Sequence, residues 1–327
     1  MAFTVVRFNL VDPGATPESL SARYRAALEM AAYADGHGVD TVQTEEHHGA
    51  VNNWLPSPFV FAGAVLGSTR RIAVTVSAII GPLYDPLRLA EDIAVLDLIG
   101  TGRLITVAGI GYRPEEYEQQ GVEWGRRGAL QDELVHTLLT AWSGEAFTYR
   151  GRTVRVTPRP YTQPHPMLLV GGSSRAAARR AARFGLPFFP SAHLPELEAY
   201  YNEQRAEYGT EGFCMMPAER TELLHLAEDP DRAWALYGEH FLHEARTYAS
   251  WQSKDIRSAV RSEATTVEEL RREGVYRIVT PDECVELGAR GGAPSLVLHP
   301  LCGGMPVDEG RRSLELLCET VLPRLTR

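Results

Sequence analysis

Short β-rich runs alternate with amphipathic helical segments along the whole sequence, and this alternation constrains the fold more than any other feature. No linker rich in Gly, Ser or Pro interrupts it, which predicts a single α/β domain over residues 1–327. Eight strands are predicted, at Phe3–Asn9, Asp40–Thr44, Ile72–Ile79, Leu104–Gly109, Met167–Gly171, Pro187–Pro190, Glu222–Ala227 and Ser295–His299. The predicted helices are Pro17–Gly36, Ser57–Ser68, Pro86–Ile99, Gly128–Trp142, Arg175–Phe184, Pro195–Tyr208, Asp229–Tyr248 and Glu309–Val321.

Eight βα units in a chain of this length favour a (β/α)8 TIM barrel over an open doubly wound sheet. Two segments depart from the repeat, and we expect both to be insertions over the C-terminal face of the barrel. Residues 146–157 contain FTYRGRTVRV, which predicts a β-hairpin with Arg150 and Gly151 at its turn. Residues 211–274 are longer than one unit needs, so we expect part of this region, including a helix at Thr266–Arg272, to form a lid.

The composition favours a small molecule as the partner. Lys and Arg total 33 against 42 Asp and Glu, a net charge of −9, so no excess of basic residues predicts binding to nucleic acid or to an anionic membrane. The four cysteines form no C-x-x-C pair, which argues against a zinc ribbon or a redox dithiol. The first segment lacks the pattern of a signal peptide, and no apolar run approaches the roughly 20 residues of a membrane span. We therefore expect a cytoplasmic protein.

Two carboxylates and two imidazoles follow the second predicted strand, in the segment TEEHHGAV. Residues after barrel strands converge on one face, so Glu45, Glu46, His47 and His48 are expected to face a substrate cavity. A solvated polar loop is the alternative interpretation. A metal site is disfavoured, because neighbouring side chains at a strand end point in opposite directions and no H-x-H or H-E-x-x-H spacing occurs.

Paired glycines and paired serines follow the fifth predicted strand. Gly171, Gly172, Ser173 and Ser174 precede a helix that Arg175 opens. Free N–H groups and hydroxyls at a helix N-terminus can bind an anion, and Arg175 opposes the helix dipole there unless an anion lies between them. The alternative is a serine N-cap before a surface helix, which leaves the paired glycines less well explained.

The fourth predicted strand ends at Gly109, and Gly111 follows one residue later. Pro114 stands where a dinucleotide fingerprint has its third glycine, so a Rossmann interpretation loses its support. The two glycines still allow a flat ring to lie against the backbone, with Tyr112 and Arg113 beside it. A simple strand-to-helix turn is the alternative.

Taken together, these segments resemble the bacterial luciferase-like flavin-dependent monooxygenase family, a group of TIM barrels. The resemblance depends on the order and spacing of several strings rather than on any one of them. The strings are TEEHHGAV, SAIIGPLYDPLRLAEDIAVLDLIGTGRL, GIGYRPEEYEQQGVEWGRRG, RPYTQPHPMLLVGGSSRAAARRAARFGLPF and LHPLCGG.

The resemblance implies a cofactor, FMN in its reduced form, with its phosphate on the Gly172–Ser174 turn and its ring over the third and fourth strand ends. It also implies a non-prolyl cis peptide at Ser77-Ala78 and a catalytic role for His47 as a base or hydrogen-bond donor, which suits an imidazole at neutral pH. The cofactor-binding residues expected are Ser77, Ala78, Gly109, Gly111, Tyr112, Gly171, Gly172, Ser173, Ser174 and Arg175.

The reaction that the resemblance implies needs three other molecules. A separate flavin reductase supplies reduced FMN, dioxygen adds to it, and the flavin hydroperoxide oxygenates a small organic substrate. The residues expected to bind the substrate are Phe8, His48, Trp54, Tyr248, Trp251 and His299. Ordinary core packing is the alternative for Tyr248 and Trp251, which lie three apart on one helix face.

Two departures from the luciferases proper are visible. Tyr112 stands where luciferases have an arginine that grips the phosphate, so this role shifts to Arg113 or Arg175. Gly111 replaces a cysteine, so we expect no light emission. Three rival functions remain: a deazaflavin-dependent dehydrogenase or reductase on the same barrel, a non-catalytic flavin-binding partner subunit, and a metal-dependent barrel hydrolase.

A homodimer is expected from the resemblance, since barrels of this family commonly pair through early helices. The apolar face of the helix Pro86–Ile99 is the candidate surface. Packing of that face on the barrel itself is an equally good interpretation. The face consists of Leu87, Leu89, Ala90, Ile93, Ala94 and Leu96.

Overall fold

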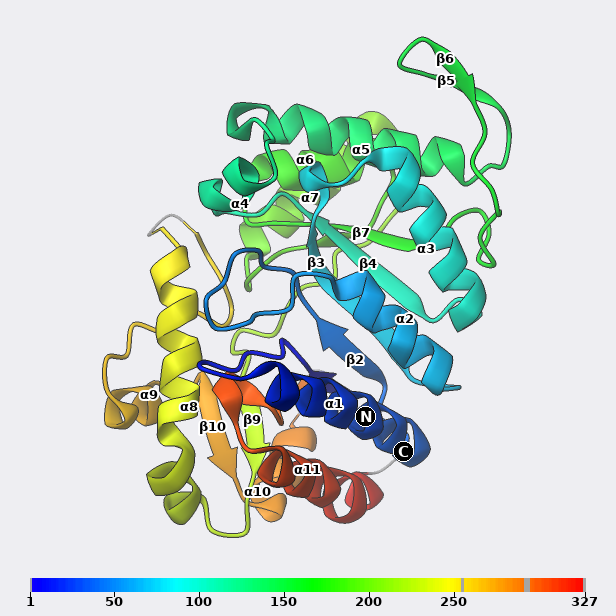
Figure 1. Cartoon of the computed structure of the whole chain (residues 1–327). Helices are drawn as coiled ribbons and strands as arrows, with labels where there is room; N and C mark the ends of the chain where they lie inside the picture. Colours follow the sequence, from blue (N-terminus) through cyan, green and yellow to red (C-terminus); the bar gives the residue numbers. More distant parts are fainter. Residues whose placement is uncertain (1, 254–255, 291–294, 326–327) are drawn as a thin grey trace. The chain divides into compact units, whose positions relative to one another are not determined.

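The computed structural model describes residues 2–253, 256–290 and 295–325. Helices alternate with parallel strands along these residues, as predicted, and the chain divides into two compact units (Figure 1). Unit 1 comprises Met1–Pro56, Ser68–Ile72 and Ala218–Arg327, and unit 2 comprises Ser57–Gly67 and Ala73–Pro217. None of the described helices combines the length and the apolarity needed to cross a membrane.

The strands of unit 1 form parallel pairs in the order β10-β9-β11-β1-β2. β1 pairs with β11 on one side, where Phe3 lies opposite Ser295, and with β2 on the other. Since β9 lies between β10 and β11, the last three strands do not follow chain order. The bounds are β1 Phe3–Arg7, β2 Thr41–Thr44, β9 Leu223–Leu226, β10 Tyr276–Val279 and β11 Ser295–Leu298.

Helix α8 supplies much of the core of unit 1. It begins after Asp229, whose side chain accepts a hydrogen bond from Arg232 N, and it has Pro230 at its first position, so both features favour a helix start here. Trp234 and Phe241 of this helix belong to the buried apolar cluster that contains Val5, Tyr276 and Val297 of the strands. The helices are α1 Pro17–His37, α8 Pro230–Trp251, α9 Val267–Glu273, α10 Pro281–Gly288 and α11 Val307–Glu315, continued by a π-helical turn at Leu316–Val321.

The strands of unit 2 pair in the order β3-β4-β7-β8, all parallel. They are β3 Ala73–Ile80, β4 Leu104–Gly109, β7 Met167–Gly171 and β8 Phe188–Phe189. The helices are α2 Pro58–Ser68, α3 Pro86–Gly100, α4 Pro114–Gln119, α5 Arg127–Ala141, α6 Arg175–Arg183 and α7 Pro195–Tyr208.

An antiparallel hairpin of β5 (Phe147–Tyr149) and β6 (Arg152–Val154) projects from unit 2 (Figure 1). Arg150 and Gly151 form its turn with φ of 47° and 77°. Positive φ at both central residues is what a tight two-residue hairpin turn requires, and glycine meets that requirement without strain. The predicted hairpin is therefore present.

The predicted strand count of eight is wrong, because the sheet of the described residues also contains β10. This strand directly follows the region predicted to contain a lid. Within that region, β9 is a buried strand and α8 buries Trp234 and Phe241. The domain bounds and the lid remain predictions. Helices α4 and α10 were not predicted either.

The apolar face of α3 packs within the chain. Leu89, Ala90, Ile93, Ala94 and Leu96 are all buried, and Leu87 is half-buried, so this face is not a free surface. The prediction that this face forms the dimer contact is therefore wrong. The alternative prediction, that the face packs against the rest of the same chain, agrees with the structure. The homodimer itself remains a prediction.

Candidate functional site

The end of β3 has the backbone form that the resemblance implies. The Ser77-Ala78 peptide bond is cis, although its second residue is alanine and not proline. The pairing of β3 with β4 shifts register between Ser77 and Ile79, at the same point. Ser77 and Ala78 are half-buried whereas Ile79 and Ile80 are buried, so the irregular peptide lies where β3 becomes accessible.

Three glycines allow the ends of β3, β4 and β7 to approach closely. A Cβ atom on Gly109 would lie 3.2 Å from Ala78 Cβ, one on Gly111 would lie 3.0 Å from Ile80 Cγ2, and one on Gly171 would lie 2.8 Å from Val107 Cγ1. Gly111 also has φ of +64°, which disfavours any other residue. The strand ends therefore form a surface of backbone and small side chains.

The turn between β7 and α6 combines a helix cap with an accessible backbone. Gly172 has φ of +142°, and a Cβ atom there would lie 3.0 Å from Ala177 Cβ. Ser174 is the N-cap of α6, and its side chain accepts a hydrogen bond of 3.3 Å from Ala177 N. Gly171, Gly172 and Ser173 are half-buried, and Ser174 is exposed.

Ser174 serves as a helix cap, as the alternative interpretation proposed. The cap binds only one of the free N–H groups at the start of α6. The first N–H groups of a helix have no acceptor within the helix, so those of α6 can bind an anion beside the cap. Arg175, the first residue of α6, is exposed and its guanidinium carbon lies 4.9 Å from the centre of the Tyr200 ring. This contact orients the guanidinium towards α7, which carries Tyr200.

The segment after β4 is held by two internal contacts. Arg113 Nη1 lies 3.1 Å from Glu116 Oε1, and the Glu116 side chain is almost fully buried. The Tyr117 hydroxyl donates to the carbonyl of Ile110 at 2.5 Å. Tyr112 is half-buried between these anchors. The ion pair places a fixed guanidinium next to the strand end, at the i,i+3 spacing that the sequence RPEE shows.

In unit 1, the loop after β2 folds back on itself and brings Trp54 to His47. His47 N donates to the carbonyl of Leu55 at 3.2 Å, which closes the loop. Gly49 and Asn53 have φ of 63° and 62°, the left-handed conformation that reverses the chain. His47 and Trp54 are both buried.

Three aromatic side chains surround His47, and we call the resulting group of four the His47 cluster: His47, Trp54, Tyr248 and Trp251. The His47 ring centre lies 5.2 Å from that of Trp54, 6.0 Å from Tyr248 and 4.8 Å from Trp251. Trp54 stacks on Tyr248 at 5.7 Å. The predicted catalytic histidine and three of the predicted substrate-binding residues therefore lie together, on the β2 loop and on α8.

His48 pairs with a carboxylate, whereas its neighbour His47 contacts aromatic rings. Its Nε2 lies 2.7 Å from Glu46 Oε1, and the Glu46 carboxylate is almost fully buried. Residues 46 and 48 are two apart, so an extended backbone places both on one face and His47 on the other. The segment predicted to face a cavity thus contains an acid–imidazole pair beside the His47 cluster.

A buried ion network surrounds Glu244 in the second half of α8. The Arg7 guanidinium pairs with Glu45 through two nitrogens and with Glu244 Oε1 at 2.9 Å. Glu244 is completely buried, and both of its oxygens lie within 3.0 Å of His299 Nε2. The sequence analysis did not identify Arg7 or Glu244; the available signal is a charged residue at a buried position of a strand and of a helix.

The network sets the charge states of its members. Burial alone would raise the pKa of the Glu244 carboxyl, but His299 and Arg7 offset this and hold the pKa well below its usual range. Burial raises the pKa of the Cys302 thiol, and the nearby Glu244 charge raises it further. Cys302 therefore stays a thiol and donates to Glu244 Oε2 at 3.3 Å.

Glu244, His299 and Cys302 have side chains of the kinds that bind metal ions, and their ligand atoms lie within 4.8 Å of one another. The donor chemistry does not favour a metal. The Glu244 oxygens already accept hydrogen bonds from Arg7, His299, Cys302 and the backbone of Gly303. The network explains this cluster without an ion.

The other three predicted substrate-binding residues make different contacts. His48 pairs with Glu46, as described above. His299 is fully buried and faces Glu244, so it belongs to the ion network. Phe8 is fully buried, and its backbone N–H donates to the carbonyl of Gln43. The predicted cofactor-binding residues all lie in unit 2. His47 and the predicted substrate-binding residues all lie in unit 1.

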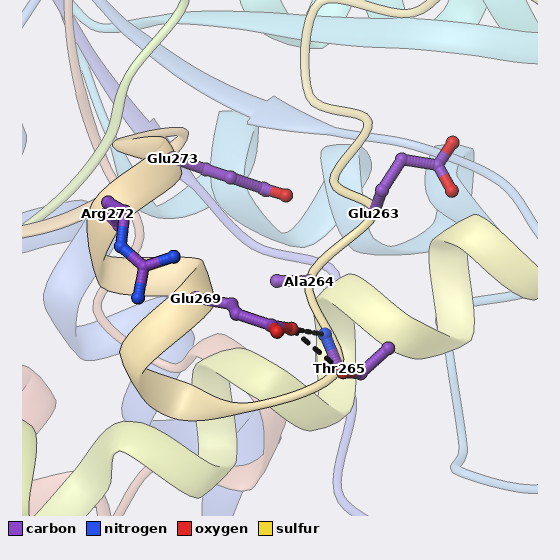
Figure 2. A pocket seen from close by; sticks show the side chains of 6 residues that line it. All are labelled: Glu263, Ala264, Thr265, Glu269, Arg272 and Glu273. Carbon is purple, nitrogen blue, oxygen red and sulfur yellow. Dashed lines mark hydrogen bonds between the residues drawn. The ribbon is translucent and has the colours of Figure 1, made fainter.

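Figure 2 shows a separate hollow of about 540 Å³ at α9, lined by Glu263, Ala264, Thr265, Glu269, Arg272 and Glu273. Glu269 reaches back to Thr265 and accepts hydrogen bonds from its backbone N and its hydroxyl. Thr266 caps the same helix by accepting from Glu269 N. Thr265, Thr266 and Glu269 therefore serve the start of α9, whereas Glu273 at its end accepts a hydrogen bond from Ser262.

The family model described as luciferase-like monooxygenase matches residues 1–289 of the chain. The alkanal monooxygenase alpha chain of Photorhabdus laumondii is 30% identical over 182 residues, which are 53% of this chain and 51% of that protein. The FMNH2-dependent dimethylsulfone monooxygenase of Pseudomonas putida is 25% identical over 59% of this chain and 52% of that protein. The chain thus spans about half the length of these curated relatives.

Solved structures match over the whole length. Monooxygenase RslO1 from Streptomyces bottropensis has a TM-score of 0.76 and 27% identity, with both chains covered completely. The oxygenating constituent of 3,6-diketocamphane monooxygenase from Pseudomonas putida, solved with FMN, has a TM-score of 0.72 at 20% identity, with 100% of this chain and 99% of that chain covered. The predicted fold class, the α/β barrel of this group, is confirmed.

Proposed function

The chain belongs to the luciferase-like monooxygenase family, and we propose that it uses reduced FMN and dioxygen to oxygenate a small organic substrate. The observation that carries the proposal is the β7–α6 turn, where Gly171–Ser173 leave the backbone accessible at a capped helix start. Such a turn suits a dianionic phosphate, because it combines N–H donors, a favourable helix dipole and hydroxyl groups.

The residues of unit 2 fit FMN in two respects. The Gly171–Arg175 turn would hold the phosphate, and Arg175 at the helix start would offset its charge. The strand ends at Ser77, Ala78, Gly109 and Gly111 would carry the isoalloxazine ring, because no side chain larger than a methyl or hydroxymethyl group stands there. Arg113, fixed by Glu116, is a second cation for the phosphate.

The flavin would supply the redox chemistry: with two electrons from reduced FMN, one atom of dioxygen would enter the substrate and the other would leave as water. The chain supplies positions and protons. His47 would donate or accept a proton at an imidazole nitrogen. Trp54, Tyr248 and Trp251 surround His47 and exclude water from it.

A separate flavin reductase is the expected partner. The trigonelline monooxygenase of Acinetobacter baylyi, which is 25% identical over 45% of this chain, is described as an oxygenase component. A homodimer is part of the same proposal. Its contact surface is not the α3 face named above.

The first experiment identifies the coenzyme. The purified protein is titrated with oxidised FMN, reduced FMN and the deazaflavin coenzyme, and quenching of tryptophan fluorescence is followed. We expect the reduced FMN to bind at low micromolar concentration. Tight binding of the deazaflavin alone would replace the proposal by a hydride-transfer function.

The second experiment tests the role of His47. Dioxygen uptake and product formation are measured with reduced FMN and a panel of aldehydes, ketones and sulfur compounds. The His47→Ala variant is expected to bind FMN normally and to lose turnover by roughly 10² to 10⁴-fold. His136→Ala, at an exposed position of α5, is the control. Unchanged turnover in His47→Ala would leave the residue a bystander and favour a non-catalytic partner subunit.

A further inference from the structure

One face of α8 carries both the ion network and the His47 cluster. Glu244, Tyr248 and Trp251 are spaced four and three residues apart, so they lie on the same side of the helix. Glu244 contacts Arg7 and His299, whereas Tyr248 and Trp251 contact His47 and Trp54. The two groups of contacts are therefore joined by less than two turns of helix.

Glu244 is the last fully buried polar residue of α8 before the His47 cluster. The buried residues of the helix end at Ala245. Tyr248 and Trp251 are only half-buried. Arg246, which precedes them, and Ser250, which lies between them, are exposed. Apolar packing thus holds the first part of the helix through Trp234 and Phe241, but it weakens in the part that meets His47.

The same network also reaches the other side of the cluster. Arg7 pairs with Glu45, which lies two residues before His47 and directly follows β2. The guanidinium therefore joins the strand end that carries His47 to the helix that carries Tyr248 and Trp251. A bidentate guanidinium fixes both the distance and the orientation of its partners.

We infer that Glu244 is a positioning residue of the His47 cluster: its ion pair with Arg7 fixes the second half of α8 so that Tyr248 and Trp251 lie against the His47 ring. The inference deepens the proposed function, because it assigns to a buried carboxylate the placement of the proposed catalytic histidine. Removing the charge leaves Arg7 with one carboxylate instead of two and loosens the helix segment beyond Ala245, where Asn52 still donates to Thr247 Oγ1 at 3.5 Å.

The test uses the full chain without flavin. Glu244→Gln keeps the shape of the side chain and removes its charge. The near-ultraviolet circular dichroism of the His47 cluster is measured, and the Trp251→Phe variant identifies the part of the signal that comes from this cluster. We expect Glu244→Gln to lose most of that part while the far-ultraviolet spectrum stays unchanged.

Asp97→Asn is the matched control. Asp97 is also completely buried, and its carboxylate accepts hydrogen bonds from Thr162 N at 2.6 Å and Thr162 Oγ1 at 3.0 Å, but it belongs to unit 2. This variant loses a buried charge in the same way and is expected to keep the cluster signal. An unchanged signal in Glu244→Gln, or an equal loss in Asp97→Asn, overturns the inference.

A conservative variant covers the case in which Glu244→Gln does not fold. Glu244→Asp keeps the charge but is one methylene shorter, so it cannot reach Arg7 and His299 unless the helix moves. If α8 moves so that the shorter carboxylate keeps its ion pair with Arg7, Tyr248 and Trp251 move with it. The cluster signal in the circular dichroism spectrum is therefore expected to change. An unchanged signal in a folded Glu244→Asp variant also overturns the inference.

The functional measurement separates this inference from the proposed function. FMN affinity is expected to be the same in Glu244→Gln and the unmodified protein. With a substrate from the panel, kcat is expected to fall by about 10²-fold while the KM for reduced FMN is unchanged. Failure of the unmodified protein to bind FMN would defeat the proposed function, whereas the circular dichroism result would still decide the role of Glu244.

Discussion

The two candidate regions differ in the size and polarity of the side chains that form them. In unit 2, the candidate residues at the ends of β3, β4 and β7 are mainly glycines and residues with small side chains, and three of the glycines lie where a Cβ atom would meet a neighbour. In unit 1, the His47 cluster and the network of Arg7, Glu45, Glu244 and His299 consist of large, charged or aromatic side chains.

The difference predicts how each region responds to substitution. A backbone surface is damaged by adding atoms, because an extra methyl group occupies the place of the ligand or of a neighbouring strand. A side-chain network is damaged by removing atoms or charge, because each buried partner that remains loses its compensation. The following four predictions test this contrast.

The largest effect is expected at Arg7, where Arg7→Met leaves Glu45 and Glu244 buried without their cation. Breaking a buried ion pair by removing one partner costs about 3–5 kcal/mol of unfolding free energy. Urea unfolding measures it. Arg88→Met is the control, because the Arg88 side chain is 72% exposed in its pair with Asp92, and a change of at most about 0.5 kcal/mol is expected there. Equal losses in the two variants would remove the contrast.

The next effect concerns pH. Burial, with a smaller contribution from His299, lowers the pKa of His225 from 6.5 to about 4. The neutral form is thus favoured in the folded protein, so its contribution to stability is present above pH 6.5 and is lost as the pH falls towards 4. This loss is about 3 kcal/mol at most. The phenylalanine variant His225→Phe is expected to flatten the fall in unfolding free energy over this range.

Urea unfolding at a series of pH values measures the slope for His225→Phe. His136→Phe, at an exposed position, provides the comparison and is expected to keep the slope of the unmodified protein. If the slope stays as steep in His225→Phe, other groups cause the acid sensitivity.

A smaller effect is expected from an added methyl group at Gly172. Gly172→Ala places a Cβ atom 3.0 Å from Ala177 Cβ at φ of +142°, which costs roughly 1–3 kcal/mol of stability and is expected to weaken FMN binding. The control is Gly67→Ala in α2, where no atom lies within 4 Å of the added Cβ. Fluorescence titration measures the affinity of both variants. Normal FMN binding by Gly172→Ala would mean that this turn does not hold the phosphate.

The smallest effect is expected from removing a cap. Ser174→Ala loses the hydrogen bond to Ala177 N, which costs about 1 kcal/mol, and it is expected to weaken FMN binding as well. Thr266→Ala removes the corresponding cap of α9 and is expected to reduce stability by a similar amount without affecting FMN. A drop in stability alone in Ser174→Ala would assign Ser174 to the helix and not to the ligand.

The sequence predicted most of the strands because their signals are local. The bounds predicted for β4 and β7 agree with the structure, since each is a short apolar run that ends at glycine. β10 was not predicted, because it directly follows a region that was predicted to be an insertion. A short strand is recognised by its pairing with a neighbouring strand, which the sequence does not show. In the structure β10 pairs with β9.

The site was predicted in the same uneven way. The Gly171–Ser174 turn and the cis peptide at Ser77-Ala78 follow from neighbouring residues and from the resemblance to a family. The ion network does not, because Arg7 and Glu244 are 237 residues apart and their pairing exists only after folding. Local patterns therefore identify a backbone site better than a site made of distant side chains.

The pairing of β1 with β11 has a consequence for synthesis in the cell. Phe3 leaves the ribosome early, but its partner Ser295 is translated almost three hundred residues later. Unit 2 lies within a nearly continuous stretch of chain and can form while translation continues, whereas unit 1 needs segments from both sides of it. Nascent β1 therefore exposes the edge that later pairs with β11 during most of elongation, and we expect chaperones that shield such edges to bind the growing chain.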